Sequence, residues 1–237
     1  MVYLIITIIA YLIGSVNFSV LISKKMAGFD VRDKGSGNGG TTNVLRTVGK
    51  KAAALTLIAD ILKGIVAVLI AWGIKKTMRE NVNGAILVQL AGFAVVVGHT
   101  FPVFFGFRGG KGIATSLGIL LLLNWKIGLI CLIFAISLMA VTRMVSLGSI
   151  SAAVLFPVLT IFIHDNYLVS GNYIVFGIAM AAFVIYNHRA NIRRIMSGTE
   201  NKLQFTTKSK ESWEILRLSK ISLDSKKVSC EMEQRIS

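Results

Sequence analysis

Residues 35–46 form a polar segment that is suited to holding a phosphorylated ligand. Four of these residues are glycines, which let the backbone take positive φ angles and approach a ligand closely. The polar side chains between them supply hydrogen-bond donors and acceptors, and the candidate binding or catalytic residues are Ser36, Asn38, Thr42, Asn43 and Arg46. A flexible connector would also contain glycine, but it would leave the density of polar side chains unexplained. Thr42 and Asn43 are also placed to cap the apolar helix that follows.

A second segment, residues 98–112, places two cations on either side of a pair of glycines. Arg108 and Lys111 flank Gly109 and Gly110 directly before an apolar run. The cations and the backbone N–H groups can therefore converge on a phosphate at a helix N-terminus. This is not a nucleotide-binding P-loop, because two positions of the pattern G-x-x-x-x-G-K-[ST] hold other residues. Snorkelling toward lipid phosphate would explain either cation if it stood alone.

Two histidines are candidates for substrate binding or proton transfer. In a third segment, residues 188–194, His188 and Asn191 are three residues apart and share one face if the last helix continues. His188 can act as a general base or hold a serine hydroxyl. His99 lies near Pro102 at the end of an apolar run, where a structural hydrogen bond explains it at least as well as catalysis does. A lone interfacial histidine is usually structural, so the catalytic interpretation of His188 depends on the other two segments.

Two charged residues lie inside an apolar run. Asp60 and Lys63 are three residues apart, where an unpaired charge would be costly in a membrane. They either pair with each other or serve the site, and the sequence leaves both possibilities open. His164 and Asp165 lie in a loop on the opposite side and are interpreted as solvated residues.

The elements that must position these side chains are apolar runs. The chain of 237 residues is 54% hydrophobic and has a mean hydropathy of +0.70, which favours a bilayer over water as its solvent. The runs lie at about residues 2–23, 52–73, 84–105, 113–123, 127–142, 147–163 and 172–187. Residues 113–141 form either one long tilted span or two short spans that turn at Asn124 to Lys126.

The distribution of lysine and arginine separates the two topologies, because cytoplasmic loops carry an excess of both. Seven spans place 21 of these cations on one side and four on the other, whereas six spans place nine against 15. The prediction is an all-α integral membrane protein with seven transmembrane helices, the N-terminus outside and the C-terminus cytoplasmic. This topology gathers the three polar segments on one face. Residues 1–205 form the membrane domain, and residues 206–237 form a basic, polar cytoplasmic tail.

The charge pattern excludes several functional classes. The net charge of +15 suits anionic membrane lipids and phosphorylated substrates. No nucleic-acid partner is expected, because membrane spans separate the basic residues and no binding motif accompanies them. Cys131 lies in an apolar run and Cys230 in the tail, so neither a disulfide nor a metal site is indicated.

Two non-enzymatic classes compete with an enzyme. A transporter or channel for a phosphorylated anion would also use several spans and converging cations, but transporters often have paired halves with broken helices at the midplane. The polar groups here gather at one surface, which favours interfacial chemistry. A lipid-binding scaffold would not need Ser36, Asn43 and His188 together.

The three segments, in this order, resemble the signature motifs of the bacterial acyl-phosphate:glycerol-3-phosphate acyltransferases, the PlsY family. The resemblance covers residues 10–202 and includes the stretches at residues 60–64 and 142–149. The motifs are Gly-Ser-Gly-Asn with Thr-Thr-Asn-Val-Leu-Arg, Gly-His-x-Phe-Pro with Gly-Gly-Lys-Gly, and His-Arg-x-Asn-Ile. The chain departs from the family at Gly39, at Thr41 and in its longer polar tail.

The resemblance implies a seven-helix enzyme of the bacterial plasma membrane that needs no cofactor or metal and whose active site faces the cytoplasm. Its expected substrates are soluble glycerol 3-phosphate and membrane-partitioned acyl phosphate. The products are 1-acyl-sn-glycerol 3-phosphate and phosphate, in the first step of phospholipid synthesis. The enzyme that makes acyl phosphate is a candidate partner.

The resemblance also assigns roles to the candidate residues. Arg46, Arg108 and Lys111 supply cations for two phosphates, and Asn38, Thr42, Asn43, His99 and Gly110 complete the substrate site. Ser36, His188 and Asn191 are the catalytic candidates. Three routes stay open: His188 removes the hydroxyl proton, an oxygen of the donor's phosphate accepts it, or Ser36 forms an acyl-enzyme. The H-x-x-x-x-D arrangement of other glycerolipid acyltransferases is absent.

Overall fold

The computed structural model describes residues 1–78, 82–163 and 173–203, and these form helices, turns and loops without a strand. His164, Asp165 and the predicted tail at residues 206–237 lie outside the described residues. The elements are α1 (Val2–Gly14), α2 (Phe18–Ala27), η1 (Val31–Asp33), α3 (Thr41–Thr47), α4 (Lys50–Thr77), α5 (Gly84–Thr100), η2 (Val103–Phe105), α6 (Ile113–Leu123), α7 (Trp125–Thr142), α8 (Val145–Phe162), α9 (Ile174–Asn187) and α10 (Arg189–Met196).

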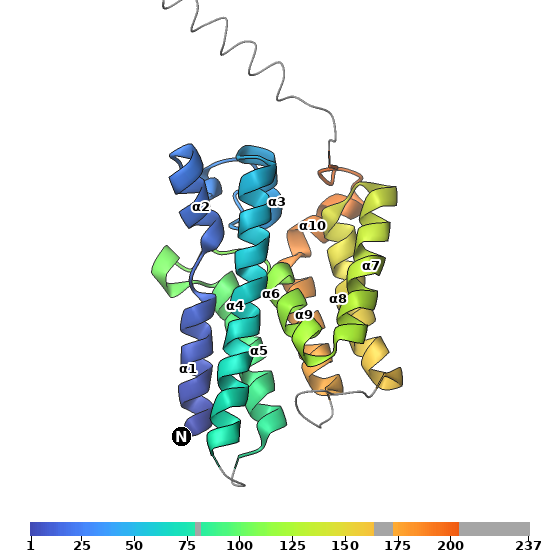
Figure 1. Ribbon diagram of the computed structural model, residues 1–237. Helices are drawn as coiled ribbons and strands as arrows, with labels where there is room; N and C mark the ends of the chain where they lie inside the picture. The colour runs from blue at the N-terminus through green and yellow to red at the C-terminus, as the bar shows by residue number, and fades with distance from the viewer. Residues whose placement is uncertain (79–81, 164–172, 204–237) are drawn as a thin grey trace, which may run out of the picture. The chain divides into compact units, whose positions relative to one another are not determined.

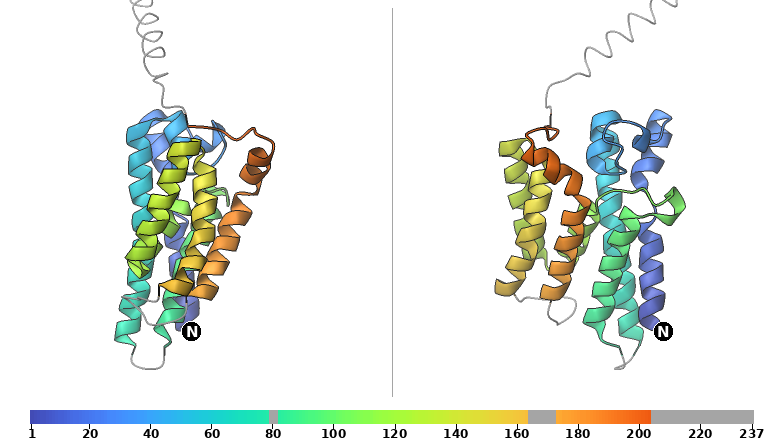
Figure 2. Two further views of the ribbon diagram at one scale, coloured as in Figure 1. Left: turned by 90° about the vertical axis from the view of Figure 1, so that its right-hand side faces the viewer. Right: turned by 180° about the vertical axis from the view of Figure 1, so that it is seen from behind.

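The long helices run alongside one another, with α6 between the group α1, α4 and α5 and the group α7, α8 and α9 (Figures 1 and 2). Among the described residues, five helical segments are long and apolar enough to cross a membrane. They are Val2–Ala27, Lys50–Thr77, Gly84–Phe105, Trp125–Thr142 and Val145–Phe162. Two shorter apolar helices, α6 and α9, coincide with the other two predicted runs. The all-helical, membrane-embedded class is confirmed, while the seven-span count and the orientation remain predictions.

The ambiguous stretch from residue 113 to residue 141 is two helices. Helix α6 ends at Leu123, and the Asn124 side chain accepts a hydrogen bond of 3.1 Å from the backbone N–H of Ile127, which caps the start of α7. The chain then turns back, and a Cβ on Gly128 would lie 2.9 Å from the Leu121 side chain. Helix α6 therefore has only 11 residues and reaches part of the length of α7 (Figure 1).

The first apolar run is interrupted, which the sequence did not predict. Helix α1 ends at Gly14, and α2 begins after Asn17, whose side chain accepts a hydrogen bond of 3.3 Å from the backbone N–H of Val20. Helix α1 packs tightly against α5, because a Cβ on Gly14 would lie 2.1 Å from the Val95 carbonyl oxygen. Small residues let helix backbones approach this closely in membranes.

Asp60 and Lys63 pair across one turn of α4, so the two possibilities left open by the sequence are not exclusive. The Lys63 ammonium lies 2.7 Å from Asp60 and donates a hydrogen bond of 3.0 Å to the Val16 carbonyl at the interruption between α1 and α2. Asp60 also lies 3.4 Å from Nδ1 of His99 and lines the pocket described below. The three charged or titratable residues are each at most 5% exposed. They pair with one another and join α4, α5 and the link between α1 and α2 beside the site.

The prediction that Thr42 or Asn43 caps the second span is wrong. Both residues belong to the separate short helix α3, and α4 begins after Gly49 without a side-chain cap. Gly49 has a φ of 121°, which favours glycine at this sharp turn. Helix α3 instead carries its polar residues to the pocket.

Candidate active site

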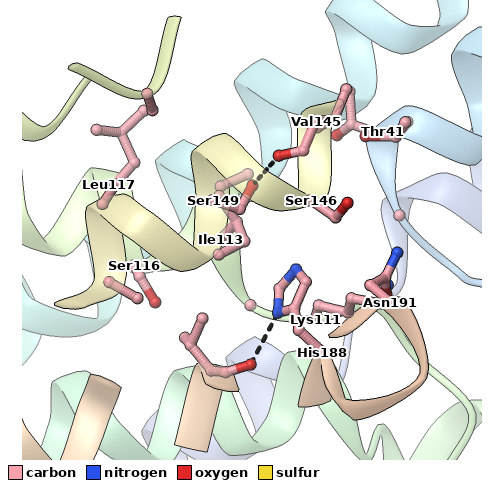
Figure 3. A pocket seen from close by; sticks show the side chains of 18 of the residues that line it. Thr41, Lys111, Ile113, Ser116, Leu117, Val145, Ser146, Ser149, His188 and Asn191 are labelled. Atoms are coloured by element: carbon pink, nitrogen blue, oxygen red, sulfur yellow. Dashed lines mark hydrogen bonds between the residues drawn. The ribbon is translucent and has the colours of Figure 1, made fainter. Parts of the chain in front are cut away.

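A pocket of about 640 Å³ has a polar end and a longer apolar end. Of the eleven predicted site residues, nine line it: Ser36, Asn38, Thr42, Asn43, Arg46, His99, Lys111, His188 and Asn191. Residues from all three polar segments therefore meet at one place. Figure 3 shows Lys111, His188 and Asn191 around the same space, with Ser146 of α8 opposite them.

Asn43 shapes the first segment. Its side-chain amide donates to the carbonyls of Val31 and Asn38 at 2.8 and 3.0 Å, and its Oδ1 accepts from the backbone N–H of Ser36 at 2.9 Å. Asn43 is 2% exposed, so these internal hydrogen bonds are its main role. The Ser36 side chain is left exposed at the edge of the pocket.

The first and second segments cross where glycines allow close approach. The Gly39 N–H donates to the Gly109 carbonyl at 3.0 Å, and the Gly110 N–H donates to the His99 carbonyl at 3.2 Å. A Cβ on Gly110 would lie 2.2 Å from Nε2 of His99 and 2.8 Å from the Gly39 carbonyl oxygen. Gly110 does not line the pocket. It allows the tight crossing that places Lys111 at the pocket.

Arg108 is the other predicted residue that does not line the pocket. Its side chain is exposed, and its backbone carbonyl accepts a hydrogen bond of 3.0 Å from the guanidinium of Arg32. Arg194, which the sequence analysis did not select, lines the pocket instead. Arg189 of the same segment does not line the pocket. Its guanidinium carbon lies over the Tyr186 ring, 4.5 Å from the ring centroid.

Lys111 is the cation most firmly placed at the polar end. Its ammonium donates to Oδ1 of Asn191, and the residue directly precedes the uncapped N-terminus of α6. Burial lowers the pKa of Lys111 to about 8, and the positive charges of Arg194 and Arg46 contribute to the shift. The side chain is still protonated at neutral pH, where it can bind a phosphate beside the free N–H groups of the helix.

His188 is held as a neutral imidazole. Its Nδ1 lies 2.8 Å from the Val184 carbonyl oxygen, which can only accept, so Nδ1 carries the proton and Nε2 is left as an acceptor (Figure 3). Burial lowers the pKa of His188 to about 4, and the charge of Lys111 contributes. The ring can therefore accept a hydrogen bond from a hydroxyl, but it is a weak base.

Glu200 organises the third segment and was missed in the sequence. Its carboxylate accepts hydrogen bonds from Ser146 at 2.8 Å and from Asn191 at 2.7 Å, and from Arg194 at 2.9 Å. Burial opposes its ionisation, but these bonds outweigh burial and hold the pKa of Glu200 below its usual range. The available signal was a single carboxylate within a strongly basic stretch, residues 188–210.

Other polar groups at the pocket were also missed. The hydroxyls of Thr41 and Ser116 are buried without a hydrogen-bond partner, so they are available to a ligand. Ser149 lines the pocket but donates to the Val145 carbonyl at 2.9 Å. Across the described ranges, no group of three His, Cys, Asp or Glu residues could hold a metal ion.

The apolar end of the pocket continues from this polar cluster between α6, α7, α8 and α9. It is lined by Leu117, Ile119, Leu120, Cys131, Leu132, Ala135, Ile136, Met139, Ala152, Ala153, Phe156, Phe176, Met180, Ala181 and Val184. We refer to this part of the pocket as the apolar lane. A molecule with a charged head and a long apolar chain would match both ends.

Comparisons with known proteins agree with this geometry. The sequence model of the family described as "Glycerol-3-phosphate acyltransferase" matches residues 4–198. A glycerol-3-phosphate acyltransferase of Clostridioides difficile (strain 630) is 44% identical over 201 residues, covering 85% of this chain and 95% of the relative. One of Thermoanaerobacter sp. (strain X514) is 44% identical over 203 residues, covering 86% and 96%.

Two solved structures share the fold. One is PlsY (YgiH), an integral membrane glycerol 3-phosphate acyltransferase, in its glycerol 3-phosphate form. It has a TM-score of 0.75 and 36% sequence identity, and the match covers 85% of this chain and 96% of that one. The lysophosphatidic acid form of the same protein has a TM-score of 0.73 and 35% identity, over 85% and 95%.

Proposed function

The chain belongs to the glycerol-3-phosphate acyltransferase family, and from this premise we propose that it transfers an acyl group from acyl phosphate to the sn-1 hydroxyl of glycerol 3-phosphate. The single observation that supports this most strongly is the continuity of the polar end with the apolar lane. Glycerol 3-phosphate would occupy the polar end, and the acyl chain of the donor would lie in the lane. Family membership argues against the transporter and scaffold alternatives.

Two phosphorylated substrates need more than one cation. Lys111, Arg46 and Arg194 all line the polar end, and the N-terminus of α6 adds unpaired N–H groups. The Arg46 guanidinium also donates to the Asn201 carbonyl at 3.3 Å, which keeps it near Glu200. The leaving group of an acyl phosphate is phosphate, and the three cations at the polar end could hold it beside the phosphate of glycerol 3-phosphate, which supports this donor.

The low pKa of His188, about 4, bears on the route of the proton. In the proposed step, the glycerol oxygen attacks the acyl carbon, the bond from that carbon to the phosphate oxygen breaks, and the hydroxyl proton passes to an oxygen of the departing phosphate. His188 accepts a hydrogen bond from the hydroxyl and orients it, and Ser36 helps to position the substrates. Asn191 holds Lys111 in place.

Purified protein in detergent is expected to form lysophosphatidate from acyl phosphate and labelled glycerol 3-phosphate, but not from acyl-coenzyme A or acyl carrier protein. Chromatographic separation of the 1-acyl and 2-acyl isomers reports the acylated hydroxyl. Incubation with acyl phosphate alone is expected to leave no acyl group on Ser36, which mass spectrometry of the intact chain measures. Equal transfer from a carrier-bound donor, or a trapped acyl-serine, would contradict the proposal.

The pH dependence is expected to follow Lys111. Because burial lowers its pKa to about 8, its charge is present below that pH and lost above it. The value of kcat/KM should therefore fall above about pH 8. His188, with a pKa of about 4, should cause no loss near neutrality. Any loss near pH 6 belongs to the substrate phosphate, whose second pKa is about 6.

The matched variant for this profile is Lys111→Arg. Arginine stays protonated throughout the accessible range, so the alkaline decline should disappear even if the overall rate is lower. Initial rates measured across a series of overlapping buffers provide the test. An alkaline decline that is the same in the variant would assign the titration to another group.

The proposal includes seven transmembrane helices, an outside N-terminus and a cytoplasmic C-terminus in the bacterial plasma membrane. The count of basic residues and the meeting of three loops at one pocket support a cytoplasmic active site. Residues 1–205 would form the membrane acyltransferase domain, and residues 206–237 a basic cytoplasmic tail. The enzyme that makes acyl phosphate would be a natural partner because this donor partitions into the membrane.

A further inference from the structure

The apolar lane ends at two aromatic rings. Phe156 of α8 and Phe176 of α9 meet edge to face, with ring centroids 6.2 Å apart and an interplanar angle of 80°. They are 8% and 5% exposed. Behind them, the Tyr173 ring packs against Phe176 with centroids 6.4 Å apart and an angle of 77°. Such edge-to-face pairs are a favoured aromatic geometry, so the three rings form a well-packed stop.

The rings are backed by a neighbouring helix. A Cβ on Gly92 of α5 would lie 3.3 Å from the tip of the Phe176 ring, so the backbone of α5 leaves this ring little room to retreat. Phe156 of α8 packs against the start of α9, since a Cβ on Gly177 would lie 3.6 Å from the Phe156 ring. The end of the lane is therefore closely packed, whereas the polar end is formed largely by loops.

The lane between mouth and rings has the length of a membrane-lipid acyl chain. Phe176 of α9 and His188, the residue that directly follows this helix, are twelve residues apart, and the lining residues between them share one face of the helix. This separation corresponds to about 18 Å at 1.5 Å per residue. One leaflet of the hydrocarbon core is about 15 Å thick, half of the whole. An acyl chain that starts at the polar end and extends along α9 therefore reaches the rings.

Four alanines lie along the walls between the two ends, among larger aliphatic side chains such as Leu132 and Met139. Ala135, Ala152, Ala153 and Ala181 line the lane from α7, α8 and α9, and each leaves space that a larger residue would fill. The aromatic rings of the lane are placed at its end. A chain of methylenes can thus lie between the helices until it meets Phe156 and Phe176.

We propose that Phe156 and Phe176 form an end wall that sets the longest acyl chain the enzyme accepts. This inference rests on the proposed function in that the lane holds the acyl chain. Each methylene that fits within the lane adds packing contacts with its walls. A chain longer than the lane must displace packed rings or leave its tail outside, so the gain stops at the wall.

The test measures binding of lysophosphatidates with saturated chains of increasing length, by the shift that each gives in thermal unfolding of the purified protein. At a fixed detergent concentration, the affinity of the unsubstituted protein should hold or rise with chain length up to a limit and fall beyond it, because a longer chain must displace packed rings. Phe176→Ala should move this limit to longer chains. Ala152→Phe places a ring one turn closer to the mouth and should move the limit to chains shorter by about 5 Å.

Phe134→Ala is the matched control, because this ring is on α7, is 42% exposed and does not line the pocket. Its length limit should equal that of the unsubstituted protein. Ala152→Phe adds a ring and Phe176→Ala removes one, so the two variants should shift the length limit in opposite directions. If one of them does not fold, the shift in the other still tests the end wall. A limit that is the same in every folded variant would overturn the end wall.

Product binding needs no turnover, which separates this inference from the choice of acyl donor. A shifted length limit without transfer from acyl phosphate would support the end wall and contradict only the donor. Transfer from acyl phosphate with an unshifted limit would retain the proposed reaction and reject the end wall.

Discussion

Replacing Lys111 with methionine is expected to lower kcat/KM for glycerol 3-phosphate by roughly a hundredfold or more. Removing a buried, charge-assisted hydrogen bond to a phosphate costs about 3 kcal/mol, which corresponds to that factor. The same change leaves Oδ1 of Asn191 without its donor. Methionine keeps the length and apolar stem of the side chain, so the pocket should retain its shape. Steady-state rates with varied glycerol 3-phosphate measure the effect.

Arg108→Met is the matched comparison, since it removes a cation three residues away that does not line the pocket. We expect it to change kcat/KM by less than about threefold, as substitutions of exposed residues usually have small energetic effects. A loss as large as that of Lys111→Met would show that Arg108 reaches the substrate, as the sequence analysis proposed. Retention of full activity in Lys111→Met would contradict the phosphate-binding role of Lys111.

Glu200→Ala is expected to cause the second large effect, on both activity and stability. The change removes the shared acceptor of Ser146, Asn191 and Arg194, and it costs about 3 kcal/mol because buried donors lose their partner. Asn191 would then be free to turn away from Lys111, so the rate should fall by roughly a hundredfold. Thermal unfolding of the purified protein, followed beside the acyl-transfer rate, measures both consequences.

One further variant separates charge from packing at this position, and another serves as a control elsewhere on the chain. Glu200→Gln keeps the size of the side chain and part of its hydrogen bonding, so we expect a smaller loss of stability than with alanine. Asp33→Ala removes an exposed carboxylate elsewhere on the chain and should change neither quantity appreciably. Wild-type stability and rate in Glu200→Ala would refute the organising role inferred for this carboxylate.

The meeting of the polar segments was predictable from the sequence because apolar runs and basic loops follow simple rules in a bilayer. Runs of suitable length locate the helices, and the charges between them suggest which loops share a face. This reasoning brought Ser36, Lys111 and His188 to one pocket, where the structure also finds them. It did not determine where an exposed side chain points, and so it did not separate Arg108 from Lys111.

Other features could not be predicted because hydropathy does not report them. In a membrane protein, a side chain that faces lipid and one that faces an apolar pocket are equally hydrophobic, so the residues of the lane gave no separate signal. The interruption after α1 lies within an apolar run. The Lys63 ammonium that donates to the Val16 carbonyl there belongs to α4, which is far away in the sequence. Glu200 acquires its role only through partners on α8 and α10.

The short length of α6 has a consequence for how the two substrates arrive. Helix α6 has 11 residues and α7 has 18, so at 1.5 Å per residue Lys111 sits about 10 Å below the far end of α7. If the reaction takes place at this polar end as proposed, glycerol 3-phosphate would have to pass below the end of α7 to reach Lys111, whereas a lipid donor could enter the apolar lane without leaving the hydrocarbon core. The lipid product would form at the same depth and could return to the bilayer along the lane.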